Sequence, residues 1–344
     1  ADDEESFVAT LRRGIKLHPG EPSLALLAGA YAGAKRHPDA PRWLAIVMQE
    51  APDWGMPHAI AADWLETAGQ LDQALLEVRE AERRRAGSAA DVMCRILAKT
   101  PKMEHLQRAA PPEDARIGFF NRTVGCRGLS AATIAEIDRL ILEESPTHPD
   151  ASLRESNRLM NTERTTEAVE LLERSLAANP RHVRLWTTLM NAHLRNQDAS
   201  KAMSLVEQAS SAGLDSHLLE EARARIEAAL GQTNDMRATI TRLRGQSMGD
   251  IRKVAATFML EGELEASLGN VDEALAAYAA ADAASPETPG LQRAAELALR
   301  SGRSSHARRI YGTLCSRNPG GPACAQEERL AKELRRATPR PALP

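Results

Sequence analysis

Aromatic residues and long hydrophobic runs are scarce in this sequence. Aromatics make up only 3% of the 344 residues, although 43% of the residues are hydrophobic. Alanine and leucine must therefore do most of the core packing, and both are strong helix formers. No stretch alternates apolar and polar residues for long, so we expect no β-strand. No run of about 18 apolar residues occurs, so we expect no helix that spans a membrane.

Charge of one sign is not in excess either. The 44 Lys and Arg residues nearly balance the 47 Asp and Glu residues, which leaves a net charge of -3. A nucleic-acid-binding protein needs a clustered basic face, and a protein held on a membrane surface needs a polybasic patch. We therefore expect that the protein neither binds nucleic acid nor inserts directly into a membrane.

Motifs for catalysis and metal binding are missing as well. The sequence has no glycine-rich phosphate loop, no nucleophile elbow and no paired histidines at helical metal spacing. Its nine histidines are scattered, and His182 and His193 have no further ligand pair beside them. The cysteines form no Cys-x-x-Cys motif, which disfavours zinc. We expect no cofactor, no metal and no enzymatic activity.

A repeat with a period of 34 residues is present instead. The segment AGQLDQALLEV at 68–78 recurs as LGNVDEALAAY at 268–278. The alanine of this motif recurs at Ala40, Ala74, Ala168, Ala202, Ala274 and Ala307. A proline follows twelve residues after four of these alanines: Pro52, Pro180, Pro286 and Pro319. The spacing predicts units of helix, short turn, helix and longer turn.

Each residue type in the motif has a physical role. Glycine tolerates the left-handed conformation that ends a first helix, as expected at Gly69, Gly269 and Gly302. A small alanine early in the second helix allows a close crossing with the first helix. Proline then ends the second helix. One helix pair cannot bury its own apolar face, so the pairs must stack.

The pattern resembles the tetratricopeptide repeat family, whose signature combines small, aromatic, glycine, alanine and proline positions. The repeat at 255–288 supplies Phe258, Gly269, Ala274, Tyr278 and Pro286. The resemblance covers roughly six repeats, and it implies an all-α fold: a right-handed α-α superhelix, or solenoid, of helix-turn-helix repeats. It also implies a scaffold that binds a protein or peptide in a concave groove.

The expected organisation follows from the repeats and their interruptions. Residues 217–254 are stretched by about four positions, and the segments KTPK at 99–102 and RAAPPED at 108–114 should break helices early. The expected segments are a capping helix or half repeat at 1–20, two repeats at 21–88, shortened or irregular repeats at 89–148, repeats at 149–321, a C-terminal capping helix at 322–336 and a disordered tail at 337–344.

The resemblance implies a set of groove residues, because the family's first helices line its concave face. Carried over to this sequence, the peptide-binding groove would contain Asn157, Met160, Asn161, Arg184, Thr187, Asn191 and Arg195. Acidic residues such as Asp63, Glu66 and Glu263 would lie towards its two ends. Asn157 and Asn191 are 34 residues apart, and a side-chain amide can pair with the backbone of an extended peptide.

The four cysteines suggest two disulfides. Cys315 falls late in the last repeat and Cys324 begins the capping helix, whereas Cys94 and Cys126 both fall in the irregular segment. We expect Cys315–Cys324 and Cys94–Cys126 bonds, with four buried free thiols as the alternative. Arginine far outnumbers lysine, which we interpret as bacterial codon usage. Disulfides would favour a periplasmic location, with the cytoplasm as the alternative.

Three hypotheses on function remain open at this point. The first is a scaffold that holds a peptide or partner protein in bacterial envelope assembly or secretion. The second is a regulatory or sensor domain of a larger membrane protein or kinase. The third is the solenoid part of an enzyme whose catalytic domain lies outside this sequence.

Overall fold

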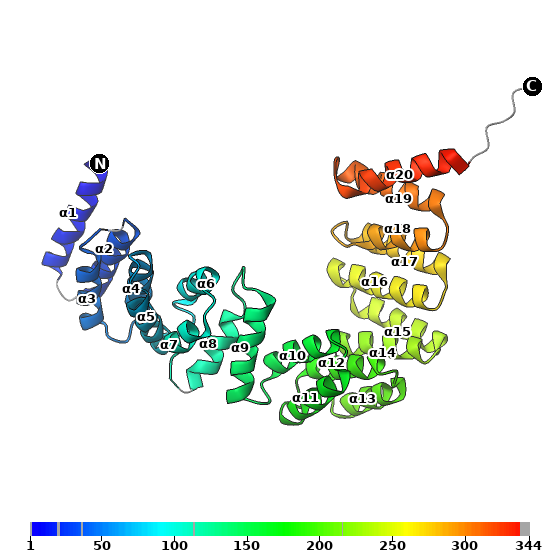
Figure 1. Ribbon diagram of the computed structural model, residues 1–344, viewed down its shortest axis with the longest axis horizontal. Coiled ribbons are helices and arrows are strands. Elements are labelled where there is room, and N and C mark those ends of the chain that lie inside the picture. Colours follow the sequence, from blue (N-terminus) through cyan, green and yellow to red (C-terminus); the bar gives the residue numbers. More distant parts are fainter. Residues whose placement is uncertain (1, 19–20, 36, 113, 215, 338–344) are drawn as a thin grey trace, which may run out of the picture. The chain divides into compact units, whose positions relative to one another are not determined.

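The computed structural model describes residues 2–18, 21–35, 37–112, 114–214 and 216–337, and these residues form twenty helices and no strand (Figure 1). Of the tail predicted at 337–344, the first residue ends the last helix, and residues 338–344 lie outside the described residues. The chain divides into two compact units, the first ending at Asn179 and the second starting at Pro180.

The first unit contains eleven helices. They are α1 (Asp2–Leu17), α2 (Pro22–Ala34), α3 (Ala40–Glu50), α4 (Gly55–Thr67), α5 (Leu71–Arg84), α6 (Ala90–Lys99), α7 (Met103–Ala109), α8 (Asp114–Thr123), α9 (Ala131–Glu144), α10 (Pro149–Asn161) and α11 (Thr165–Ala178). Pairs form from α2 with α3, α4 with α5, and α10 with α11, and α4 also packs on both helices of the pair before it.

The second unit contains nine helices. They are α12 (Val183–Arg195), α13 (Ala199–Ser211), α14 (His217–Ala229), α15 (Thr233–Gln246), α16 (Ile251–Ser267), α17 (Val271–Ala284), α18 (Gly290–Arg300), α19 (Ser304–Arg317) and α20 (Pro322–Ala337). Each odd-numbered helix from α13 to α19 packs on the helix before it, and α20 packs on α19. Figure 1 shows these pairs following one another within the unit.

The alanine register of the sequence is confirmed. The motif alanine is the fourth residue of five second helices, and each of these residues is completely buried: Ala74, Ala168, Ala202, Ala274 and Ala307. A side chain of one carbon lets the two helices of a pair cross closely. The glycines predicted to end first helices, such as Gly69 and Gly269, have φ angles of 77° and 82°. These values lie in the left-handed region that glycine adopts without steric cost.

The two stretches predicted to be irregular, at 89–148 and 217–254, have different structures. In the first unit, α6 and α7 form a short pair, with only seven residues in α7. In the second unit, the extra residues extend α16, which has 17 residues where α14 has 13. An α-helix has 3.6 residues per turn. The four additional residues therefore add one turn at the start of α16 and leave the rest of its register unchanged.

Two cysteine pairs lie at disulfide distance, one in each unit. Cys94 in α6 reaches Cys126 after α8 with an S–S distance of 1.98 Å, and Cys315 in α19 reaches Cys324 in α20 with 1.94 Å. No cysteine among the described residues is left free. The first bond would tie the short pair to the helix that follows it, and the second would hold the capping helix on the last pair.

We expect the denatured, unreduced protein to show no reactive thiol in an Ellman titration. Loop-closure entropy predicts a loss of about 4 kcal/mol when Cys94 and Cys126 become serine, and about 3 kcal/mol for the Cys315 and Cys324 pair. The first pair costs more because it spans 32 residues rather than 9. Four reactive thiols in protein made in an oxidising compartment would contradict both bonds.

Candidate functional site

The asparagines predicted for the groove in the first unit lie on the surface of α10. Asn157 and Asn161 are exposed and four residues apart, so they share one face of the helix. Met160 is only 6% exposed and packs in the core. Of the three groove residues predicted on α10, Asn157 and Asn161 therefore lie at the surface, whereas Met160 packs beneath it.

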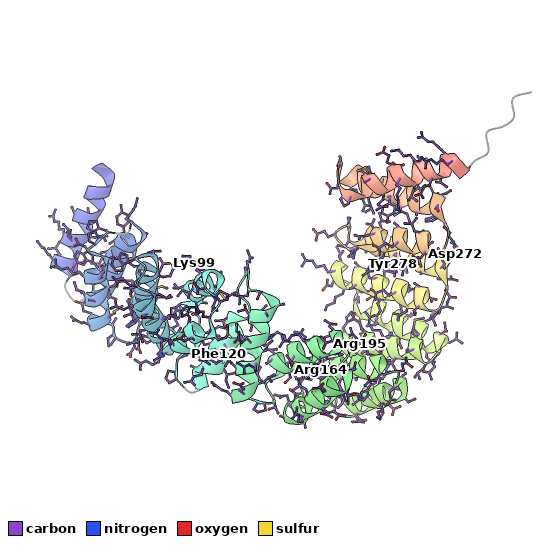
Figure 2. The ribbon with its side chains drawn as sticks, in the orientation of Figure 1. Lys99, Phe120, Arg164, Arg195, Asp272 and Tyr278 are labelled. Carbon is purple, nitrogen blue, oxygen red and sulfur yellow. A yellow bond between two sulfur atoms is a disulfide. The ribbon has the colours of Figure 1, made fainter. Side chains whose placement is uncertain are left out.

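The predicted groove residues of the second unit lie on α12. Arg184, Asn191 and Arg195 are exposed at spacings of seven and four residues, which places them on one helix face (Arg195 is labelled in Figure 2). Thr187 Oγ1 donates a hydrogen bond to the Arg184 carbonyl at 3.2 Å. Because α10 and α12 belong to different units, each set of residues is brought together only on its own helix.

The acidic residues predicted towards the start of the groove are paired with bases. Asp63 of α4 forms an ion pair with Arg95 of α6, and Glu66 of α4 with Lys99, which is labelled in Figure 2. Arg95 Nε also lies 3.8 Å from Glu66 Oε2. These contacts balance the two carboxylates of α4 with two cations of α6.

A hollow of about 530 Å³ lies between the first helices α16 and α18 of the second unit. We call it the α16–α18 hollow. Its lining consists of Glu263, Ala266, Ser267, Tyr278, Arg293, Leu297, Arg300 and Ser301. Glu263 is one of the residues predicted for the groove. The alanine and the two serines of the lining leave space because their side chains are short.

Two glycines position Tyr278 at this hollow. A Cβ on Gly262 of α16 would lie 2.6 Å from two ring carbons of Tyr278. A Cβ on Gly290, the first residue of α18, would lie 2.5 Å from the Tyr278 carbonyl oxygen. Only glycine permits both approaches, so α16 and α18 close on Tyr278 from its two sides. The ring is 4% exposed and is labelled in Figure 2.

The charged groups of the hollow favour an anionic ligand. Arg293 and Arg300 are seven residues apart on one face of α18, and both are exposed. Arg293 lies 3.7 Å from Glu296, whereas Arg300 forms no ion pair with any residue that the structure describes. Glu263 is already paired with Arg225 of α14 at 3.2 Å.

Tyr278 adds a hydrogen-bond donor. Burial raises the pKa of its hydroxyl, and the nearby Glu263 carboxylate raises this pKa further. The opposing effects of Arg293 and Arg300 are smaller. The hydroxyl therefore stays protonated near neutral pH. Together with two guanidinium groups, it can bind a carboxylate through charge-assisted hydrogen bonds.

The sequence interpretation missed both arginines of the hollow. It carried the groove positions onto four repeats but did not carry them onto the last repeat. A usable signal was present, because Arg293 and Arg300 share one face of the predicted first helix of that repeat. Gly262, which creates the contact with Tyr278, also occupies the small-residue position of its repeat but was not identified.

Residues 159–226 match the tetratricopeptide repeat family. This stretch begins in α10 and ends in α14, so it contains the complete pair of α12 and α13. Helix pairs with the same buried alanine register lie on both sides of it. The chain is a tetratricopeptide-like helical repeat protein.

Solved structures of tetratricopeptide proteins resemble this repeat protein at low identity. YrrB, described as a TPR protein with an unusual peptide-binding site, is 16% identical, with a TM-score of 0.33 over 57% of this chain and 99% of its own. Yeast Tom70 is 8% identical, with a TM-score of 0.46 over 97% and 93%. A tetratricopeptide repeat protein from Parabacteroides merdae is 13% identical, with a TM-score of 0.40 over 87% and 100%. No curated protein matches the sequence.

A helical repeat protein of this kind has the fold of a protein–protein interaction scaffold. Within the described residues, no helix is both long and apolar enough to cross a membrane. The same residues contain no cluster of three or more His, Cys, Asp or Glu side chains placed to hold a metal ion.

Proposed function

We propose that this repeat protein is a non-catalytic scaffold that binds an extended peptide segment of a partner protein. The peptide lies along first helices, and one of its carboxylates enters the α16–α18 hollow. The observation that carries the proposal is that Arg293, Arg300 and Tyr278 line one hollow. Guanidinium groups bind carboxylates with two parallel hydrogen bonds, which gives direction as well as affinity.

The exposed amide of α12, which lies in the same unit as the hollow, suits the rest of such a ligand. Asn191 is exposed, and its amide can both donate to and accept from a peptide backbone. Backbone pairing of this kind holds an extended segment whatever its side chains are. Affinity would then come in part from Asn191 and selectivity from the carboxylate in the hollow.

The proposed setting is the bacterial periplasm, in envelope assembly or secretion. The two cysteine pairs at disulfide distance support an oxidising compartment, because cytosolic thiols are kept reduced. The test is to fractionate the native cell and probe each fraction with an antibody against this protein. Recovery of the reduced protein from the cytoplasm would contradict the proposed location.

Replacing Arg293 and Arg300 with alanine together is expected to weaken partner binding at least tenfold, or by about 1.5–3 kcal/mol. The partner is first isolated by affinity purification with the wild-type protein, and both proteins are then compared by titration calorimetry. Arg252→Ala is the matched control, because it removes an exposed arginine of α16 that does not line the hollow. Equal affinity of the double variant and the wild type would place the carboxylate site elsewhere.

The substitution Asn191→Ala is expected to weaken binding of the same partner by about 0.5–1.5 kcal/mol, because one hydrogen-bonding amide is lost. Asn191 is exposed, so the circular dichroism spectrum and melting temperature should stay the same. Asn234→Ala on α15 is the control, since this exposed asparagine lies on a second helix. An unchanged calorimetric affinity would remove Asn191 from the binding site.

A further inference from the structure

A separate hollow of about 720 Å³ lies in the first unit, between α1, α2 and the start of α3. We call it the α1–α3 hollow. Its lining consists of Ala9, Leu11, Arg12, Arg13, Lys16, Ala28, Tyr31, Ala32, Lys35, His37, Asp39 and Trp43. None of these residues belongs to the proposed peptide groove, and a volume of this size is typical of ligand pockets.

Two helix faces with the same spacing form the sides of this hollow. On α1 the lining residues Ala9, Arg12, Arg13 and Lys16 are related by spacings of three and four residues, with Arg12 and Arg13 adjacent, so they share one face. On α2 the residues Ala28, Tyr31 and Ala32, with the C-cap residue Lys35, repeat this pattern. The short alanines leave the space open, since a leucine at any of these positions would fill part of it.

Aromatic and apolar groups form the inner walls. Trp43 of α3 is half-buried, and Tyr31 of α2 faces the same space. Lys35 Nζ lies 5.9 Å from the centre of the Tyr31 ring, within the range of a cation–π contact. These flat surfaces can contact a large apolar or aromatic side chain of a ligand over much of its area.

The rim of the hollow is positively charged. Arg12 pairs with Asp39 at 3.1 Å, which closes one side. His37 Nδ1 accepts a hydrogen bond from the Asp39 backbone N–H at 3.2 Å. Arg13 and Lys16 are exposed, and neither forms an ion pair with the residues that the structure describes. Both cations are therefore available to an acidic ligand at the edge.

We infer that the α1–α3 hollow binds an acidic peptide segment that inserts one aromatic side chain between Tyr31 and Trp43. Carboxylates next to that side chain pair with Arg13 and Lys16. A peptide fits better than a polyanion such as nucleic acid, because the cations are few, they stand at the rim of an apolar space, and the whole chain carries a net charge of -3. This site is independent of the α16–α18 hollow, which lies in the other unit.

The test uses three fluorescein-labelled, C-terminally amidated peptides in an anisotropy titration of the full chain. The first has the sequence Glu-Asp-Phe-Asp-Glu, the second replaces every acid by its amide, and the third replaces Phe by Ala. We expect the first peptide to bind at least about tenfold more tightly than either of the others, with an affinity that falls as salt is added. Equal binding of all three, or no binding, would overturn the inference.

Variants then locate the bound peptide. Arg13→Ala with Lys16→Ala should weaken binding about tenfold or more. Ala9→Trp should weaken it as well by filling the hollow from an exposed position, without a change in melting temperature. Arg42→Ala is the matched control, because it removes an exposed cation of α3 that does not line the hollow. If only Arg293→Ala with Arg300→Ala abolished binding, the peptide would occupy the α16–α18 hollow and the inference would be wrong.

Discussion

Gly262→Ala is expected to destabilise the second unit by about 3 kcal/mol, because the new methyl group overpacks a close contact. The Cβ would lie 2.6 Å from two carbons of the Tyr278 ring, and that ring is 4% exposed and cannot move outward freely. Chemical denaturation followed by circular dichroism measures the change in the free energy of unfolding. The substitution should also weaken partner binding, since a displaced Tyr278 no longer lines the α16–α18 hollow in the same way.

A second glycine provides the control for this effect. Gly245 of α15 has no heavy atom within 4 Å of the position that a Cβ would take. Gly245→Ala should therefore stabilise the protein, by about 0.5–1 kcal/mol, because alanine is the better helix former. In a Tyr278→Leu background, Gly262→Ala should cost much less than in the wild type, since the clashing ring is absent. A cost of Gly262→Ala that is the same in both backgrounds would contradict the proposed contact.

Asp138→Ala is expected to cost about 3 kcal/mol of stability in the first unit, because it removes the buried carboxylate that two half-buried arginines share and leaves Arg158 with Glu155 and Arg154 with Asn121 alone. Asp138 of α9 is completely buried, and it accepts from Arg154 Nε at 2.8 Å and from Arg158 Nη1 at 2.8 Å. Both arginines come from α10, so this carboxylate joins two consecutive helices. Denaturant titration of the variant measures the loss.

The neighbouring pair Arg139–Glu143 is the matched control for Asp138. Its side chains are 65% and 56% exposed, and exposed ion pairs contribute about 0–1 kcal/mol. Glu143→Ala should therefore change the stability by about 0.5 kcal/mol or less. Similar effects of the two substitutions would show that the bonds of Asp138 do not hold α10 on α9. These bonds concern the predicted groove because α10 carries Asn157 and Asn161.

Much of the fold could be predicted because it depends on local pattern. A 34-residue spacing of alanine, glycine and proline specifies where each helix pair begins, crosses and ends, and Ala74 and Ala274 lie completely buried at the predicted crossings. The same reasoning predicted two irregular segments. It did not show that the first segment forms a short helix pair or that the second adds a turn to α16. Both outcomes depend on how the neighbouring helices pack.

The candidate sites were less predictable, because a hollow is a property of three helices at once. Helix periodicity alone predicts that residues such as Asn157 and Asn191 are exposed. Met160 shows the limit of that approach, because its place in the register predicted a groove contact but the side chain packs inside. Whether a residue at the edge of the buried face meets solvent depends on the crossing of the adjacent helices.

The sequence by itself determined the helical class, the repeat length, the buried alanines and the positions of the turns, because these follow from backbone propensity and the 3.6-residue period. Only the tertiary structure decided which charged side chains meet, such as Asp63 with Arg95 across 32 residues. It also decided where short side chains leave a space open, as at Ala266 and Ala28. Ion pairs and hollows depend on distances between helices, and those distances are set by packing rather than by any one segment.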